Sequence, residues 1–127
     1  MQDRPSAPEL LDAIERFLRG RSAASEDRWL RFQLLVCANS LAIVRREMEQ
    51  EEGFVRAEWP VLDAILGAAK VPGTYGELLP AMSERHEQLC AMIRAGTFDD
   101  PEQERALLVY LVQETEHRVR ITAPGEL

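Results

Sequence analysis

The stretch LRFQLLVCANSLAIVRREM, from Leu30 to Met48, decides the fold. Its apolar residues recur at alternating steps of four and three, which places one set on a single stripe of an α-helix. That set is Leu30, Leu34, Cys37, Leu41, Val44 and Met48, and a second set fills the other sides: Phe32, Leu35, Val36, Ala38, Ala42 and Ile43. A helix that is apolar nearly all round is surrounded by others. The stretch therefore predicts a long central helix, over about residues 26–51, wrapped by the rest of the chain.

Signals for helix ends divide the remaining sequence. Ser6 with Glu9 and Thr74 with Glu77 match the capping box that begins a helix. Glycines are expected to end the helices, and Pro60 to interrupt one, because proline has no amide hydrogen. No strand pattern competes, so we predict an all-α fold: a compact bundle of four to five helices in a single domain over 1–127, with loose ends at about 1–5 and 122–127. The expected helices cover about residues 7–19, 26–51, 60–66, 74–95 and 101–121, with stops at Gly20, Gly53, Gly67 and Gly96.

The composition limits the class of protein. The chain has 127 residues, 46% of them apolar, and a net charge of −7. This acidic balance argues against binding to nucleic acid, and no apolar run approaches the roughly 18 residues of a membrane span. The start of the chain lacks the apolar segment of a secretory signal. Fourteen arginines against one lysine favour a bacterial source. We expect a cytoplasmic protein in which Cys37 and Cys90 are buried, reduced thiols.

Four segments together resemble a known family. They are MQDRP followed by Glu9-Leu10-Leu11, ANSLAIVRRE at residues 38–47, LCAMIRAG at residues 89–96, and the final helix. The pattern is similar to a bacterial domain-of-unknown-function family of small helical proteins, typically encoded beside acyl-CoA dehydrogenases and aminoglycoside-phosphotransferase-like proteins. The resemblance implies a context in acyl-CoA metabolism, leaves room for a protein partner, and transfers no catalytic residue. It also implies an Asn-Pro near the C-terminus, where this chain has Ala123-Pro124.

Candidate ligand-binding residues are few. Asn39 lies in the middle of the central helix, where it either bonds a packed helix or lines a polar pocket. Arg45 and Arg46 follow the apolar centre; they either form a helical ion-pair face, as the spacing of Arg45 to Glu49 suggests, or hold an anion. Arg94 would add to such an anion site from the helix over 74–95.

Both histidines belong to incomplete motifs. His86 precedes Cys90 by one helical turn, but zinc needs three or four ligands and no second pair is present. A core histidine and a pocket residue both remain open for His86. Glu114 and His117 form one E-x-x-H, whereas di-metal bundles use two, so we expect a solvated helix end there. The sequence predicts no metal site, no cofactor and no catalytic residue.

These observations favour a non-enzymatic accessory or interaction module, which binds a protein partner or forms a homodimer. The alternative is a bundle that binds a small acyl, CoA-like or anionic ligand through Asn39, Arg45, Arg46, His86 and Arg94. A small enzyme of the same pathway is a third hypothesis. Neither nucleic acid nor a membrane is expected as a partner.

Overall fold

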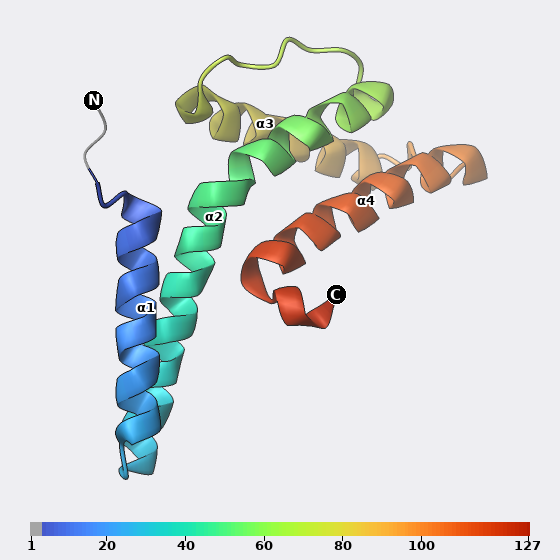
Figure 1. Ribbon diagram of the computed structural model, residues 1–127. Coiled ribbons are helices and arrows are strands. Elements are labelled where there is room, and N and C mark those ends of the chain that lie inside the picture. The colour runs from blue at the N-terminus through green and yellow to red at the C-terminus, as the bar shows by residue number, and fades with distance from the viewer. Residues whose placement is uncertain (1–3) are drawn as a thin grey trace. The chain divides into compact units, whose positions relative to one another are not determined.

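The structure, a computed structural model, describes residues 4–127, and these are helical almost throughout (Figure 1). Four α-helices and one 3-10 turn account for the described part, in which no strand occurs, so the predicted all-α class is confirmed. The helices are α1 (Ala7–Ala24), α2 (Arg28–Leu66), α3 (Tyr75–Arg94) and α4 (Pro101–Thr122), followed by the 3-10 turn η1 (Pro124–Glu126). Within the same residues, no helix is long and apolar enough to cross a membrane.

The chain divides into two compact units, Met1–Glu51 and Glu52–Leu127. The first contains α1 and the N-terminal part of α2, and we call it the hairpin unit. The second contains the C-terminal part of α2 with α3, α4 and η1, and we call it the three-helix unit. Each unit has its own contacts, and the functional surfaces below each belong to one of them.

The hairpin unit holds its two helices together with few buried side chains. Ser6 caps α1, because its side-chain oxygen accepts a hydrogen bond from the amide of Glu9 at 3.3 Å, as the capping box predicts. Ser22 Oγ donates to the carbonyl of Arg31 at 3.0 Å and so ties the end of α1 to the first turn of α2. Ala38 and Ala42 are buried, and their small size is suited to close approach of the helices.

The three-helix unit contains the larger core. Its buried side chains come from all three helices and from the α3–α4 loop: Val55, Trp59, Leu62, Leu78, Met82, Leu89, Phe98, Leu107 and Tyr110. Apolar side chains of this kind each contribute roughly 1.5–3 kcal/mol when fully buried. This cluster therefore stabilises the second unit much more than the two alanines stabilise the first.

The predicted stops at Gly20, Gly53 and Pro60 were wrong. Gly20 lies within α1, while Gly53 and Pro60 lie within α2, which continues for 39 residues to Leu66. A proline inside a helix removes one hydrogen bond and disfavours the helix by about 3 kcal/mol relative to alanine. Here the buried residues Trp59 and Leu62 stand on either side of Pro60, and their packing outweighs that local cost. The predicted helix at 60–66 is thus the end of α2.

The connector between α2 and α3, residues 67–74, is irregular but tightly held by side chains. Arg85 Nη2 donates to the carbonyl of Gly67 at 2.9 Å, and Trp59 Nε1 donates to the carbonyl of Ala69 at 2.9 Å. Arg56 donates to the carbonyls of Pro72 and Gly73 at 3.0 and 3.1 Å. Four backbone carbonyls of the connector are therefore satisfied without regular secondary structure.

Candidate functional site

The predicted site residues of the hairpin unit are engaged in its own helix contact. Arg19 of α1 donates from Nη2 to Asn39 Oδ1 at 2.9 Å and from Nε to Glu15 Oε2 at 2.8 Å. Arg45 Nη2 donates to the other oxygen of Glu15 at 3.3 Å. Burial alone would raise the pKa of Glu15, but the hydrogen bonds and charges of Arg19 and Arg45 outweigh it and lower that pKa. Asn39 and Arg45 thus share one network that joins α1 to α2, and Arg46 follows on the same helix.

The two predicted residues of α3 have different surroundings. His86 Nε2 lies 2.6 Å from the hydroxyl oxygen of Tyr110 on α4. Arg94 is exposed in the last turn of α3. The structure therefore does not gather Asn39, Arg45, Arg46, His86 and Arg94 within either unit, and ligand binding by these five residues stays a prediction.

His86 and Tyr110 form a buried polar pair. Burial, followed by the negative charges of Glu58 and Glu114, raises the pKa of Tyr110, so its hydroxyl keeps its proton. Burial also lowers the pKa of His86, which favours the neutral ring. Tyr110 can then donate to Nε2 of a neutral imidazole whose proton is on Nδ1. No pattern in the sequence indicates a role for Tyr110, because an aromatic residue on an apolar helix resembles any other core residue.

A second pair, Glu58 with His117, lies in the same unit. The Glu58 side chain on α2 is only 7% exposed, and its Oε1 lies 3.6 Å from Nδ1 of His117 on α4. The His117 ring stacks on Phe54 with centroids 4.2 Å apart, and its Nδ1 has no hydrogen-bond partner. Glu114, one turn before His117 on α4, pairs with Arg118. The predicted solvated end at Glu114 and His117 was therefore wrong, since both side chains are 17% exposed.

The two pairs and Glu114 belong to one unit and influence one another's charge, so we call them the polar cluster: Glu58, His86, Tyr110, Glu114 and His117. Glu58 is its most strongly perturbed acid. Burial, and then the negative charge of Glu114, raises its pKa to about 7, with Arg118 opposing the shift. Burial lowers the pKa of His117, so both members of the pair favour their neutral forms. Among residues 4–127, no group of three or more His, Cys, Asp or Glu side chains has the geometry to hold a metal ion. Glu58 is thus an acid within the helix packing that keeps its proton to near neutral pH, beside two histidines that favour their neutral forms.

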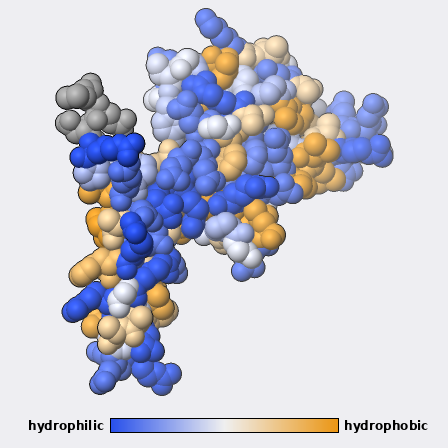
Figure 2. Space-filling view, in the orientation of Figure 1, coloured by the Kyte–Doolittle hydropathy of each residue, from blue (hydrophilic) through white to orange (hydrophobic). Residues whose placement is uncertain are grey.

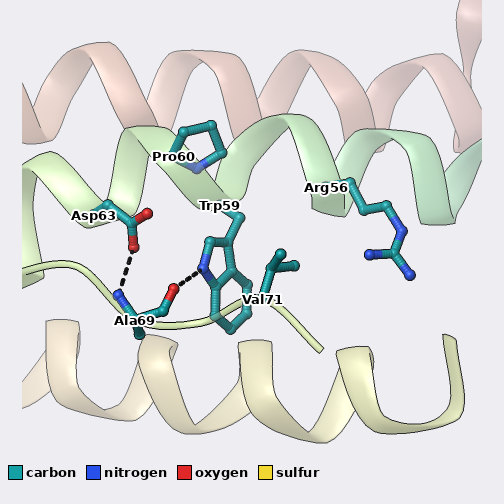
Figure 3. A pocket seen from close by; sticks show the side chains of 6 residues that line it. All are labelled: Arg56, Trp59, Pro60, Asp63, Ala69 and Val71. Carbon is teal, nitrogen blue, oxygen red and sulfur yellow. Dashed lines mark hydrogen bonds between the residues drawn. The ribbon is translucent and has the colours of Figure 1, made fainter. Parts of the chain in front are cut away.

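A hollow of about 270 Å³ lies between α2 and the connector (Figure 3). It is lined by Arg56, Trp59, Pro60, Asp63, Ala69 and Val71. Asp63 Oδ1 accepts from the Ala69 amide at 3.2 Å and from Arg85 Nη1 at 2.7 Å. The Arg85 guanidinium also lies 4.5 Å above the Trp59 ring, where its charge faces the π electrons. The polar groups around this hollow are used by the fold itself, and none of the five predicted residues lines it.

The hairpin unit exposes many apolar side chains, some of which are visible at the lower left of Figure 2 as orange patches between hydrophilic ones. On α1 the exposed stripe is spaced by four and three residues, and α2 carries a matching stripe. Together they form what we call the hairpin face: Leu10, Ile14 and Phe17 of α1 with Leu30, Val44 and Met48 of α2, each between 42% and 65% exposed.

The two stripes lie on the same side of the hairpin. Arg19 and Asn39 meet through their hydrogen bond and mark one side of the contact between α1 and α2. At 100° per residue, Leu10 and Phe17 lie on the side of α1 opposite to Arg19. By the same measure, Leu30 and Val44 lie on the side of α2 opposite to Asn39. The hairpin face is therefore one continuous surface of two helices.

Cys37 shares the α2 stripe of the hairpin face, and Cys90 lies on α3. Both thiols are exposed, so the prediction that they are buried was wrong. The reason is the same for Cys37 as for its neighbours on α2. The apolar pattern predicted a helix covered on all sides, but within the hairpin unit α2 packs against α1 alone.

The comparison with protein families decides the identity. The model of a domain of unknown function, DUF6285, matches residues 23–125. The chain belongs to this family. No curated protein and no solved structure matches it significantly. The DUF6285 match spans all of α2, α3 and α4, and with them Gly53, Pro60 and the connector, which the resemblance seen in the sequence had not used. Residues 1–22, on which part of that resemblance rested, lie outside the matched span.

Proposed function

We propose that this DUF6285 chain is an interaction module, not an enzyme, and that it binds a polypeptide chain whose helices cover the hairpin face. The carrying observation is that apolar residues of α2, such as Val44 and Met48, are half exposed although their pattern is that of a wrapped helix. A contiguous apolar patch on a water-exposed surface is often functional, and contact with another polypeptide is one such function. The proposed context is acyl-CoA metabolism in a bacterial cytoplasm, as the family resemblance implies.

Binding of a small anionic ligand has weaker support. Asn39 and Arg45, which would contribute to that site, already bond Arg19 and Glu15. A ligand that reached them would have to break this network, which joins the helices of the hairpin unit.

The two cysteines allow a direct test in living cells. Cys37 lies on the same α2 stripe as Leu30 and Val44 of the hairpin face and Cys90 does not, yet both are exposed in the chain. In cells treated with a membrane-permeable maleimide, we expect Cys37 to react at least tenfold more slowly than Cys90, because the bound chain covers it. Mass spectrometry of the two peptides gives both rates from one sample. Equal rates would overturn the proposed function.

A further inference from the structure

We propose that the chain covering the hairpin face is a second copy of this protein, and that the two hairpin units form one four-helix bundle. This inference rests on the proposed function and names its partner. The evidence comes from the repeat of the apolar residues, from the area of the hairpin face and from the distribution of charge.

The apolar residues of the α2 stripe follow a heptad repeat, but some of them have no packing partner within the hairpin unit. Leu34 and Leu41 of this repeat are half buried, whereas Leu30, Val44 and Met48 are exposed. In a four-helix bundle each helix turns such a stripe towards the bundle axis and contacts two neighbours. Here α1 supplies one neighbour, and the exposed residues face the position of the other.

The missing layer has to consist of helices with an apolar stripe of the same kind. The hairpin unit itself carries two of these, because Leu10, Ile14 and Phe17 on α1 repeat the spacing of the α2 stripe. A two-fold axis through the hairpin face would bring four matching stripes together. Such self-complementary contacts are the commonest arrangement in homo-oligomers.

The area of the hairpin face is that of a standard dimer contact. Six large side chains, each between 42% and 65% exposed, present apolar surface on the order of several hundred Å². A standard interface buries about 800 Å² on each partner, of which about 65% is apolar in homodimers. The apolar area of the hairpin face is therefore comparable to that which one partner contributes to a standard interface.

The distribution of charge allows this surface to meet its own copy. Residues 1–51 contain eight arginines and nine acidic residues, a net charge of −1, whereas residues 52–127 carry the remaining −6. The residues on the stripes themselves are all uncharged: Leu10, Ile14 and Phe17 on α1, and Leu30, Leu34, Cys37, Leu41 and Val44 on α2. Two hairpin faces can thus pack without the like-charge repulsion that would oppose contact between two three-helix units.

Matched valines on α2 provide the test. Val44 belongs to the hairpin face and is 42% exposed, while Val36 is 46% exposed and lies about 80° further round the same helix, outside the α2 stripe. Because both side chains are half exposed in the single chain, a glutamate at either position is compatible with folding. We expect sedimentation equilibrium to give a dimer for the unmodified protein and for Val36→Glu. We expect Val44→Glu to weaken the dimer at least a hundredfold, because two buried carboxylates would meet in the bundle.

Cys37 separates the partner from the proposed function itself. In the purified dimer, Cys37 should react with maleimide at least tenfold more slowly than Cys90, and dilution or Val44→Glu should abolish the difference. A monomer with reactive Cys37 in vitro, together with protection in cells, would overturn the second copy and leave a different protein as the partner. Equal reactivity in both settings would overturn both proposals. A monomer whose Cys37 is protected at every concentration would show that the chain covers its own hairpin face, which also overturns both.

Discussion

Glu58 couples the stability of the three-helix unit to pH. Its pKa is raised from 4.5 to about 7 in the folded chain, so the folded state holds a proton that the unfolded state has released. The stabilisation is complete below about pH 4.5 and is lost as pH rises through 7. The amide side chain of the Glu58→Gln variant would be neutral at every pH. We therefore expect the unfolding free energy of Glu58→Gln, relative to that of the unmodified chain, to increase by about 2 kcal/mol from about pH 5 to pH 8. Urea unfolding at both pH values measures this gain.

The histidines of the cluster act in the opposite direction. Burial lowers the pKa of His86 and of His117, so acid pH disfavours folding through both rings. Glu58→Gln is therefore compared with the unmodified chain at each pH. Both proteins contain the two histidines, so the effect of the rings cancels. Glu87→Gln, at an exposed position of α3, is the control and should follow the unmodified chain. If the Glu58→Gln and unmodified curves run parallel, the proton is not held on Glu58.

Arg85 is a buried charged residue whose removal should destabilise the three-helix unit. Its side chain is 6% exposed, it pairs with Asp63 at 2.7 Å, and it also holds the Gly67 carbonyl. Removing one partner of a buried pair typically costs about 3–5 kcal/mol. We expect Arg85→Met to lower the unfolding free energy by about 3 kcal/mol in urea titration. Arg94→Met, at an exposed end of the same helix, should change it by less than about 0.5 kcal/mol.

At the level of elements, the sequence predicts helices well and their ends less well. The apolar spacing and the Ser6 capping box correctly indicate an all-α chain and the start of α1. The helix ends predicted from Gly53 and Pro60 were wrong. Glycine and proline are local signals, and they contain no information about the burial of Trp59 and Leu62 by α3 and α4. A helix end is decided by packing partners that lie far away in the sequence.

Pro60 offers a direct measure of that competition. It is exposed within α2, and its ring displaces one backbone hydrogen bond. We expect Pro60→Ala to restore the bond to the carbonyl of Arg56 and to raise the unfolding free energy by about 1–3 kcal/mol. Thermal unfolding with matched urea titration measures the change. A loss of stability would instead mean that the geometry at Pro60 is required to place Trp59 in the core.

The candidate sites were predictable only in part. The heptad of α2 already marks the hairpin face, but the pattern cannot say whether the covering helices belong to the same chain. Glu58 carried no signal, since a single glutamate between Ala57 and Trp59 resembles a solvated one. Its pairing with His117 depends on the register between α2 and α4, which no local pattern encodes.

For the whole molecule, the two units should differ in how their stability depends on concentration. The hairpin unit buries few side chains and would gain its main apolar contact in the proposed dimer, whereas the three-helix unit has its own core. Stability that comes from association follows mass action. We expect hydrogen exchange of α1 and of α2 before Glu51 to become at least tenfold faster on dilution below the dimer dissociation constant. Exchange in α3 and α4, the internal reference, should stay unchanged; equal acceleration in all helices would contradict the division.

The connector at residues 67–74 has a consequence for proteolysis. It holds the single lysine of the chain, Lys70, so a lysine-specific protease has one bond to cut. Irregular exposed loops are usually cleaved first, but side chains of Trp59, Arg56 and Arg85 hold the carbonyls on both sides of Lys70. Cleavage requires that these hydrogen bonds break first. The cleavage rate therefore reports the local opening of the three-helix unit. The connector, although irregular and exposed, is therefore protected by its hydrogen bonds, and cleavage after Lys70 reports when they break.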